Sequence, residues 1–260
     1  MKMDIRYGGL AMEYQEKIRM LAALLKSPGP NFALTGAGVS TESGIPDFRS
    51  PGTGLWTKYD PMQVASLSSL RRDPAAFYAV NLPRWQTFEG VQPNDAHLSL
   101  ARLEKHGYLV GVITQNIDSL HRIAGSRRVW EVHGHLRTCH CMDCERSYPF
   151  RELTERAAAR GLPRCAACNG VLRPDVVLFE DQMSDDFYKA TRALTGCQLL
   201  LVAGSSLQVY PAAGLPQYAR RVVIINREET PWDEQAVLVI HASTGRVFRD
   251  LLAEMNVPEN

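Results

Sequence analysis

Two cysteine pairs give the clearest chemical signal in this sequence. Cys141 and Cys144 form a C-x-x-C pair, and Cys165 and Cys168 repeat that spacing further along the chain. Each pair can place two thiolates on one metal ion, and four thiolates complete the tetrahedral shell of zinc. Because a closed shell leaves no position for water or substrate, we expect one structural zinc ion that supports a small, loop-rich region.

The remaining cysteines are not needed for that site. Cys139 is too close to Cys141 to be a first-choice ligand, so it and His140 stay outside the predicted set. Cys197 stands alone and is expected to be a small buried hydrophobic residue. The alternative for all six is that they are scattered core cysteines, which the double C-x-x-C spacing disfavours.

Zinc ribbons often bind nucleic acid, but the charge of this chain does not favour that function. The chain as a whole has 29 Lys and Arg against 28 Asp and Glu. A nearly neutral protein has no bulk electrostatic attraction for phosphate backbones or anionic membranes. We therefore expect no direct nucleic-acid partner and no membrane partner.

A glycine-rich turn over residues 36–44 (GAGVSTESG) follows an apolar segment, NFALT, at 31–35. Small residues directly after a strand let backbone N–H groups meet a nucleotide phosphate. The turn differs from the dehydrogenase fingerprint G-x-G-x-x-G, because Thr41 stands where the third glycine belongs. It indicates a phosphate-bearing ligand without indicating an ordinary dehydrogenase.

Polar side chains follow two further apolar segments. Gln115, Asn116, Ile117 and Asp118 come after 108–114, and His133 ends the segment 129–133 just before a glycine. Ligands of open α/β sheets bind at the carboxyl ends of the strands, and a histidine there is a candidate general base. Two alternatives stay open: Asn116 could cap a helix with Asp118 in its first turn, and His133 could be structural.

The elements that would position these residues alternate along the chain. Apolar runs predict strands at 31–35, 108–114, 198–204 and 221–226. Helical patterns occupy 12–26, a stretch capped by Asn94 or Asp95, 184–195, 211–220 and 243–256 with Ser243 as cap. This alternation predicts a parallel α/β sheet. Residues 50–90 are expected to form loops and short helices, and 134–174 a small insert.

Length and composition set the class of protein. A chain of 260 residues and 29.0 kDa can form one large domain or two modest ones. No apolar run approaches the roughly 20 residues of a membrane helix, and the first ten residues lack the core of a signal peptide. Since the cysteines are clustered rather than spread as in disulfide scaffolds, we expect a cytoplasmic location.

Taken together, these pieces resemble the sirtuin family of NAD-dependent protein deacylases, and the resemblance runs from about residue 14 to the C-terminus. The matching stretches are 36–49 (GAGVSTESGIPDFR), 114–118 (TQNID), 133–134 (HG), 173–179 (RPDVVLF), 204–206 (GSS), 225–226 (IN) and both cysteine pairs. The resemblance implies a Rossmann-like large domain with a parallel sheet, made of 1–43, 91–133 and 175–260. It also implies a small domain, made of a helical module with a cofactor loop (44–90) and a zinc-binding module (134–174).

The implied activity is NAD-dependent lysine deacetylation, in which the acyl group moves from acyl-lysine to ADP-ribose and nicotinamide and O-acetyl-ADP-ribose are released. His133 would act as general base, with Asn116 as the second catalytic residue. The implied NAD-binding residues are Gly36, Ala37, Thr41, Asp47, Phe48, Arg49, Gln115, Asn116, Ile117, Asp118, Gly204, Ser205, Ser206 and Asn226. An acetyl-lysine peptide would add as a strand between segment 176–180 and Val209, touching Val176, Val177, Phe179 and Val209.

Two other functions stay open: mono-ADP-ribosyl transfer to protein from the same pocket, and a non-enzymatic NAD- or zinc-dependent binding module. The chain also departs from the family pattern. Glu180 replaces the glycine of the usual Phe-Gly-Glu, which predicts a negative groove edge that favours basic peptides. Ala236 and Val237 stand where an acid is common. The stretch 77–84 lacks the Tyr-x-x-Arg of desuccinylating members, which predicts acetyl or longer neutral acyl substrates.

Overall fold

A six-stranded parallel sheet forms the centre of the computed structural model, which describes residues 12–47, 54–57 and 59–258. Its strand order is β3 (Val129–Glu131), β2 (Gly111–Thr114), β1 (Asn31–Thr35), β7 (Leu199–Ala203), β8 (Val222–Ile225) and β9 (Leu238–Ile240). All neighbouring pairs are parallel, and β1, β2, β7 and β8 are buried along their whole length. The predicted parallel α/β sheet is confirmed, and β9 is a strand that the sequence pattern did not reveal.

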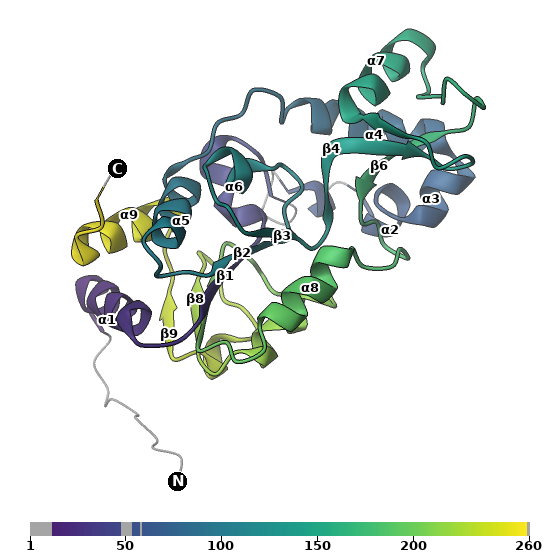
Figure 1. Ribbon diagram of the computed structural model, residues 1–260. Helices are drawn as coiled ribbons and strands as arrows, with labels where there is room; N and C mark the ends of the chain where they lie inside the picture. Colours follow the sequence, from purple (N-terminus) through teal and green to yellow (C-terminus); the bar gives the residue numbers. More distant parts are fainter. Residues whose placement is uncertain (1–11, 48–53, 58, 259–260) are drawn as a thin grey trace.

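Helices cover both faces of this sheet, because alternate residues of each strand point to opposite sides. Helices α1 (Tyr14–Lys26), α5 (Asp95–Lys105) and α9 (Thr244–Met255) pack on one face through one apolar cluster, and the two terminal helices lie side by side (Figure 1). Helix α8 (Asp185–Ala193) and the 3₁₀ segment η4 (Ala212–Tyr218) cover the other face. The short helix α6 (Leu120–Ile123) follows β2.

Two details of the helix predictions change. The expected helix at 211–220 is the 3₁₀ segment η4, because Pro216 lies inside it and cannot donate a backbone hydrogen bond. Asn94 is the cap of α5, with its side chain accepting from the amide of Ala96 at 2.9 Å. Ser243 occupies the cap position of α9 but makes no capping hydrogen bond with its side chain.

A second, smaller layer lies beyond one edge of the large sheet (Figure 1). It contains the antiparallel sheet β5 (Ser147–Pro149), β4 (Gly134–Cys141) and β6 (Leu172–Val176), with helix α7 (Phe150–Arg160). Helices α2 (Pro61–Val64), α3 (Leu67–Arg72) and α4 (Pro74–Gln86) pack against it, with Phe77, Tyr78 and Trp85 in a shared apolar core. Short 3₁₀ turns occupy Ala37–Val39, Thr41–Ser43, Leu55–Thr57 and Asp233–Gln235.

A buried carboxylate joins the two layers. Glu131, at the end of β3, is only 3% exposed, and both of its oxygens accept from the guanidinium of Arg137 on β4 at 2.6 Å. Arg122 adds a third bond at 3.1 Å. A charged group this deeply buried needs such partners to offset its lost hydration. The pairing therefore fixes the chain on either side of the β3–β4 connection, which carries His133.

The topology also locates the binding crevice. From β1 the chain builds outward to β2 and β3, and then returns to β7 on the other side of β1. Ligands bind at such a reversal of strand order, outside the carboxyl ends of the strands. Among the described residues, no helix is both long and apolar enough to cross a membrane.

Candidate active site

A cleft of about 380 Å³ opens at the carboxyl ends of the sheet, between the large sheet and the smaller layer. The described residues expected from sequence to bind NAD or peptide, or to catalyse, all line it. They are Gly36, Ala37, Thr41, Asp47, Gln115, Asn116, Ile117, Asp118, His133, Val176, Val177, Phe179, Gly204, Ser205, Ser206, Val209 and Asn226. Phe48 and Arg49, predicted for the cofactor loop, lie outside the described residues.

The glycines in the turn after β1 allow that turn to pack closely against the turn after β7. A Cβ placed on Gly38 would lie 2.8 Å from the Cα and carbonyl oxygen of Gly204, and one on Gly36 would lie 2.9 Å from that oxygen. Gly204 has a φ of +58°, and a Cβ there would meet the amide of Val39 at 2.4 Å. Glycine is required because the turns after β1 and β7 touch directly. The amide of Ala37, which lines the cleft, forms no hydrogen bond among the described residues and is available to a phosphate oxygen.

A polar chain holds Asn116 and Asp118 in the floor of the cleft. The Asn116 Nδ2 donates to the Gly36 carbonyl at 3.1 Å and to the Ser40 hydroxyl at 3.0 Å. Ser40 in turn donates to Asp118 Oδ2 at 2.7 Å, and Asp118 Oδ1 accepts from the amide of Leu120. The next helix, α6, begins at Leu120 with Ser119 in its cap position, so Asn116 is not a helix cap and that alternative is wrong. Its Oδ1 accepts no hydrogen bond from the described residues, so it is free to accept one from a ligand.

Burial dominates the electrostatics of Asp118. It raises the pKa of the carboxyl group, while the bonds from the Leu120 amide and the Ser40 hydroxyl oppose that shift. Ser40 was not singled out from the sequence, although it lies in the glycine-rich turn. Its role depends on contacts with residues almost 80 positions away, which no local pattern displays.

His133 has a defined tautomer in this structure. Its Nδ1 lies 3.1 Å from the carbonyl oxygen of Gln115, which can only accept, so Nδ1 carries the proton and Nε2 is left as a proton acceptor. Burial lowers the pKa of the imidazole below its usual value, and the bond to Gln115 opposes part of that shift. The ring is therefore neutral at pH 7, the state that a general base requires.

The glycine after this histidine is required by the close packing of two strands. Gly134 has a φ of +75°, and a Cβ there would lie 2.2 Å from the carbonyl oxygen of Asp175. Strand β4 can approach β6 this closely only with glycine at this position. Gly134 thus fixes the backbone next to His133.

Polar side chains at the other end of the cleft are held by hydrogen bonds to a neighbouring side chain or to the backbone. Gln115 Nε2 donates to the Ser205 hydroxyl at 2.8 Å, and the Thr41 hydroxyl donates to the Gly38 carbonyl at 3.0 Å. Asn226 Nδ2 donates to the Glu228 carbonyl at 2.8 Å. These bonds shape the rim of the cleft and leave the Ser205 hydrogen as a donor toward a bound molecule.

Two buried histidines beneath the cleft floor were missed by sequence reasoning. His97 and His121 are 0% and 1% exposed, and their ring centres are 4.8 Å apart. His121 Nε2 lies 2.8 Å from the Thr35 hydroxyl, and His97 Nε2 lies 3.4 Å from the Ser40 hydroxyl. They connect the polar chain of the floor to helices α5 and α6. The available signal was a histidine among the core-facing positions of a predicted helix.

Acidification from pH 7 to pH 5 is expected to destabilise the protein partly through His97. Burial lowers its pKa from the usual 6.5 to about 4. The unfolded chain then takes up more protons than the folded one, so this contribution is present above pH 6.5 and lost as the pH falls toward 4. Between pH 7 and 5 the loss from His97 is about 2 kcal/mol in the free energy of unfolding.

Urea unfolding of wild type and His97→Gln at pH 7 and pH 5 measures the contribution of His97 to the loss of unfolding free energy. The variant is expected to be less stable at pH 7 but to lose about 2 kcal/mol less on acidification. Asp118, whose pKa is raised, contributes with the opposite sign, but it is present in both proteins and leaves the difference intact. Equal losses in the two proteins would contradict the explanation.

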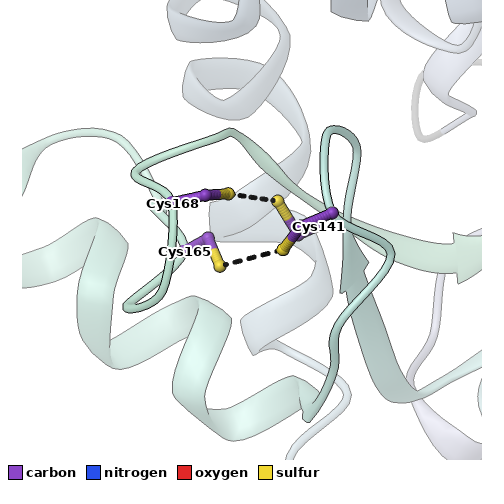
Figure 2. Close-up of side chains that lie close together, drawn as sticks. Cys141, Cys165 and Cys168 are labelled. Atoms are coloured by element: carbon purple, nitrogen blue, oxygen red, sulfur yellow. Dashed lines mark hydrogen bonds between the residues drawn. The ribbon is translucent and has the colours of Figure 1, made fainter.

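The four predicted zinc ligands converge at the far end of the smaller layer. The Sγ atoms of Cys141, Cys144, Cys165 and Cys168 all lie within 4.8 Å of one another. A dashed line in Figure 2 joins Cys141 to Cys168 at 3.4 Å, and the sulfur atoms of Cys144 and Cys165 are 3.7 Å apart. Tetrahedral Zn–S bonds of about 2.3 Å place sulfur atoms about 3.8 Å apart, so this donor set fits a zinc ion.

Both cysteine pairs lie on turns of the same form. The amides of Asp143 and Ala167 each lie 3.4 Å from the Sγ of the first cysteine of their pair, and donate to it. Glu145 and Asn169, the residues after each pair, both adopt positive φ. Such N–H···S bonds stabilise thiolates, which zinc requires. Cys139 and His140 lie outside the four-sulfur cluster, as expected, and Cys197 is buried under the large sheet.

Comparison with known proteins gives consistent matches. The Sir2 family model matches residues 36–211. An "NAD-dependent protein deacetylase 2" from Caldanaerobacter subterraneus subsp. tengcongensis is 45% identical over 92% of this chain and 96% of its own length. The structure of a Sir2–p53 peptide–NAD⁺ complex superposes with a TM-score of 0.86 at 34% identity, covering 93% of this chain and 99% of its own. A Sir2 variant with a deacetylated p53 peptide and 3′-O-acetyl ADP ribose gives a TM-score of 0.89 at 35% identity, with the same coverage.

Proposed function

The chain belongs to the Sir2 family, and on that premise we infer that it is an NAD-dependent protein lysine deacetylase. It transfers the acyl group of an acyl-lysine to ADP-ribose, so it is an acyl transferase with NAD as co-substrate and one structural zinc ion. The observation that carries this function is the cleft in which His133, Asn116 and Asp118 meet the glycine turn.

Bound NAD supplies an electrophilic ribose carbon when its nicotinamide departs. The cleft fits such a ligand, because it offers the unpaired Ala37 amide for a phosphate and the Asn116 Oδ1 for a hydroxyl or amide donor. Asn116 is held by two hydrogen bonds and Asp118 by two more, so both can orient a ligand without first being ordered themselves. We assign the NAD contacts to the predicted residues that line this cleft.

His133 is the proposed general base. Its protonated Nδ1 is fixed by Gln115, and its free Nε2 can take a proton from a ribose hydroxyl. The resulting imidazolium would keep the Gln115 carbonyl as a partner, which stabilises the charged form. Asn116 completes the catalytic pair by holding the ligand in line rather than by moving a proton.

The acyl-lysine peptide is proposed to lie between two backbone segments of the cleft. The carbonyl oxygen of Val177 and the amide of Glu180 form no hydrogen bonds among the described residues, and neither does the amide of Val209 opposite them. Unpaired backbone groups on two facing segments can accept an extended peptide as an added strand. Val176 and Phe179 would flank it, and affinity would come mainly from the backbone.

The proposed division of the chain follows the two sheets. All strands of the large sheet fall within 1–43, 91–133 and 175–260, whereas α2, α3 and α4 fall within 44–90. The zinc-binding module, 134–174, contains β4, β5 and most of β6. The cytoplasmic location and the absence of nucleic-acid and membrane partners stay predictions from charge and composition.

One experiment separates deacetylation from the two alternative functions. The enzyme is incubated with an acetyl-lysine peptide, with and without NAD labelled in the adenylate. Loss of the acetyl group only with NAD, and no label on protein, is the expected result. Label on protein without peptide deacetylation would indicate mono-ADP-ribosyl transfer, and no consumption of NAD would indicate a binding module; either would overturn the proposal.

Acetyl groups are expected to be removed at least about tenfold faster than succinyl groups from the same peptide, in kcat/KM. The stretch from Phe77 to Arg84 has no Tyr-x-x-Arg, and the side-chain amide of Asn81 is committed to the carbonyls of Val64 and Phe77. A succinyl carboxylate in this cleft would lose hydration without the Tyr-x-x-Arg pair to offset that loss, which is expected to give at least a tenfold preference for acetyl. Matched acetyl and succinyl peptides measure the ratio, and faster desuccinylation would refute the prediction.

A further inference from the structure

Glu180 has an unusual backbone conformation next to the proposed peptide groove. Its φ is +75°, in the left-handed region that side chains with a Cβ rarely adopt. It directly follows Phe179 and borders the cleft. A residue held in such a conformation needs surrounding contacts that fix it, and these are often connected with function.

The Glu180 carboxylate makes two hydrogen bonds to one residue of helix α3. Oε2 accepts from the Ser68 amide at 2.8 Å, and Oε1 accepts from the Ser68 hydroxyl at 3.0 Å. Ser68 is 112 positions away in the chain and belongs to the first turn of α3, where backbone amides lack partners within the helix. The side chain therefore ties the segment after β6 to the helical module.

The adjacent backbone continues this connection. Phe179 and Ser66 form a parallel bridge in which the Phe179 amide donates to Ala65 at 2.9 Å and the Phe179 carbonyl accepts from Leu67 at 3.0 Å. The bridge occupies the side of Phe179 that faces the helical module. The carboxylate of Glu180 extends that attachment by one residue, to the place where the backbone turns.

A second ion pair holds the same segment from the zinc-module side. Arg173 on β6 donates to both oxygens of Asp181, at 3.1 and 2.6 Å, and the pair is nearly buried. Asp181 Oδ2 also accepts from the Leu178 amide at 2.9 Å. Segment 177–181 is thus held on two sides, by the nearly buried Arg173–Asp181 pair and by the solvent-exposed Glu180–Ser68 contact.

We propose that Glu180 is a positioning residue that fastens segment 177–181 to helix α3 and thereby sets the groove that receives the acyl-lysine peptide. This role rests on the proposed function. It differs from the effect expected from the sequence, in which the Glu180 charge itself attracts basic peptides, because it depends on the two hydrogen bonds to Ser68 and not on the charge. The two roles give different results when the charge is removed but the hydrogen bonds are kept.

Steady-state kinetics of four variants, with matched basic and acidic acetyl-lysine peptides, separates them. Glu180→Ala is expected to raise the peptide KM about fivefold for both peptides, with kcat and the NAD KM changed less than about twofold. Glu180→Gln can still accept from the amide and donate to the hydroxyl of Ser68, so it is expected to stay within about twofold of wild type. Ser68→Ala should have a smaller effect, and the double variant Ser68→Ala/Glu180→Ala should match Glu180→Ala alone.

Glu155→Ala, which removes an exposed carboxylate from α7, is the matched control and should change none of these constants. An unchanged KM in Glu180→Ala would overturn the proposal. So would a Glu180→Gln variant that loses affinity for basic peptides only, or effects of the two single alanine variants that simply add.

Hydrogen exchange gives a readout that does not depend on turnover. The amides of 177–181 and of 66–70 are expected to exchange faster in Glu180→Ala than in wild type, while those of β1 and β7 are unchanged. Protection equal to wild type would overturn the fastening itself. If wild type failed to deacetylate any peptide, the proposed function would fail, and the exchange result would still decide whether Glu180 holds the segment.

Discussion

Replacing His133 by alanine is expected to lower the rate of deacetylation roughly a thousandfold, the typical contribution of a positioned general base. The variant loses the only imidazole that lines the described cleft, and with it the Nε2 acceptor that the bond to Gln115 keeps unprotonated. The ring makes no hydrogen bond to Asn116, Asp118 or the glycine turn in the described structure, so the rest of the site should persist. Binding of NAD, measured by calorimetry, should therefore change less than about fivefold.

His135→Ala is the matched control, because this histidine lies two residues further along the chain, on β4, and does not line the cleft. It should retain activity within about twofold. Comparable activity of His133→Ala and wild type, with both proteins folded, would remove His133 from the mechanism. A parallel loss in the His135→Ala control would show that the strand had been disturbed rather than the base removed.

Replacing Cys165 by alanine is expected to release the zinc ion and unfold the small domain. Apparent binding energies of structural zinc in small peptides are about 10–16 kcal/mol at pH 7, far more than the small core around the site can replace. The loss should extend beyond the zinc module, because Tyr78 on α4 donates to the Leu172 carbonyl on β6 and shares its apolar core. Deacetylation should fall with the zinc content, because β4 begins directly after His133 and β6 ends at Val176, and both of these residues line the cleft.

Metal analysis should find about one zinc ion per chain in wild type and none in Cys165→Ala. Cys197→Ala is the control: it also removes a buried thiol, but from the core beneath the large sheet, and should keep both zinc and activity. Thermal unfolding should show a much larger fall of the midpoint in the Cys165 variant than in the Cys197 variant, which loses only the packing of one buried thiol. A metal-free protein with full activity would contradict the structural role of zinc.

The sequence was most informative where one kind of local signal was enough. The fully buried strands β1, β7 and β8 were predicted within one residue at each end, because continuous apolar runs between polar ends admit few other structures. The zinc ligands were equally predictable, because the C-x-x-C spacing by itself allows two thiolates to bind one metal ion. The 13-residue helix α4 was not foreseen, because Pro83 and a mixture of aromatic residues hide its periodicity.

The parts that the sequence did not reveal depend on contacts between distant segments. The bond from Ser40 to Asp118 spans 78 positions, and the bond from Ser68 to Glu180 spans 112. The buried pair His97 and His121 is brought together by the packing of α5 and α6. The local sequence around each of these residues is also compatible with an ordinary structural or surface role. Only the tertiary structure shows which role the residue has.

In the proposed reaction the acyl group leaves lysine and ends on ADP-ribose. The measurement is mass spectrometry of the products after wild-type enzyme acts on a peptide whose acetyl group carries ¹³C, in the presence of NAD. The expected products are labelled O-acetyl-ADP-ribose, free lysine peptide and nicotinamide in equal amounts, and none of them should form without NAD. Labelled free acetate formed at the same rate without NAD, or intact peptide beside consumed NAD, would contradict it.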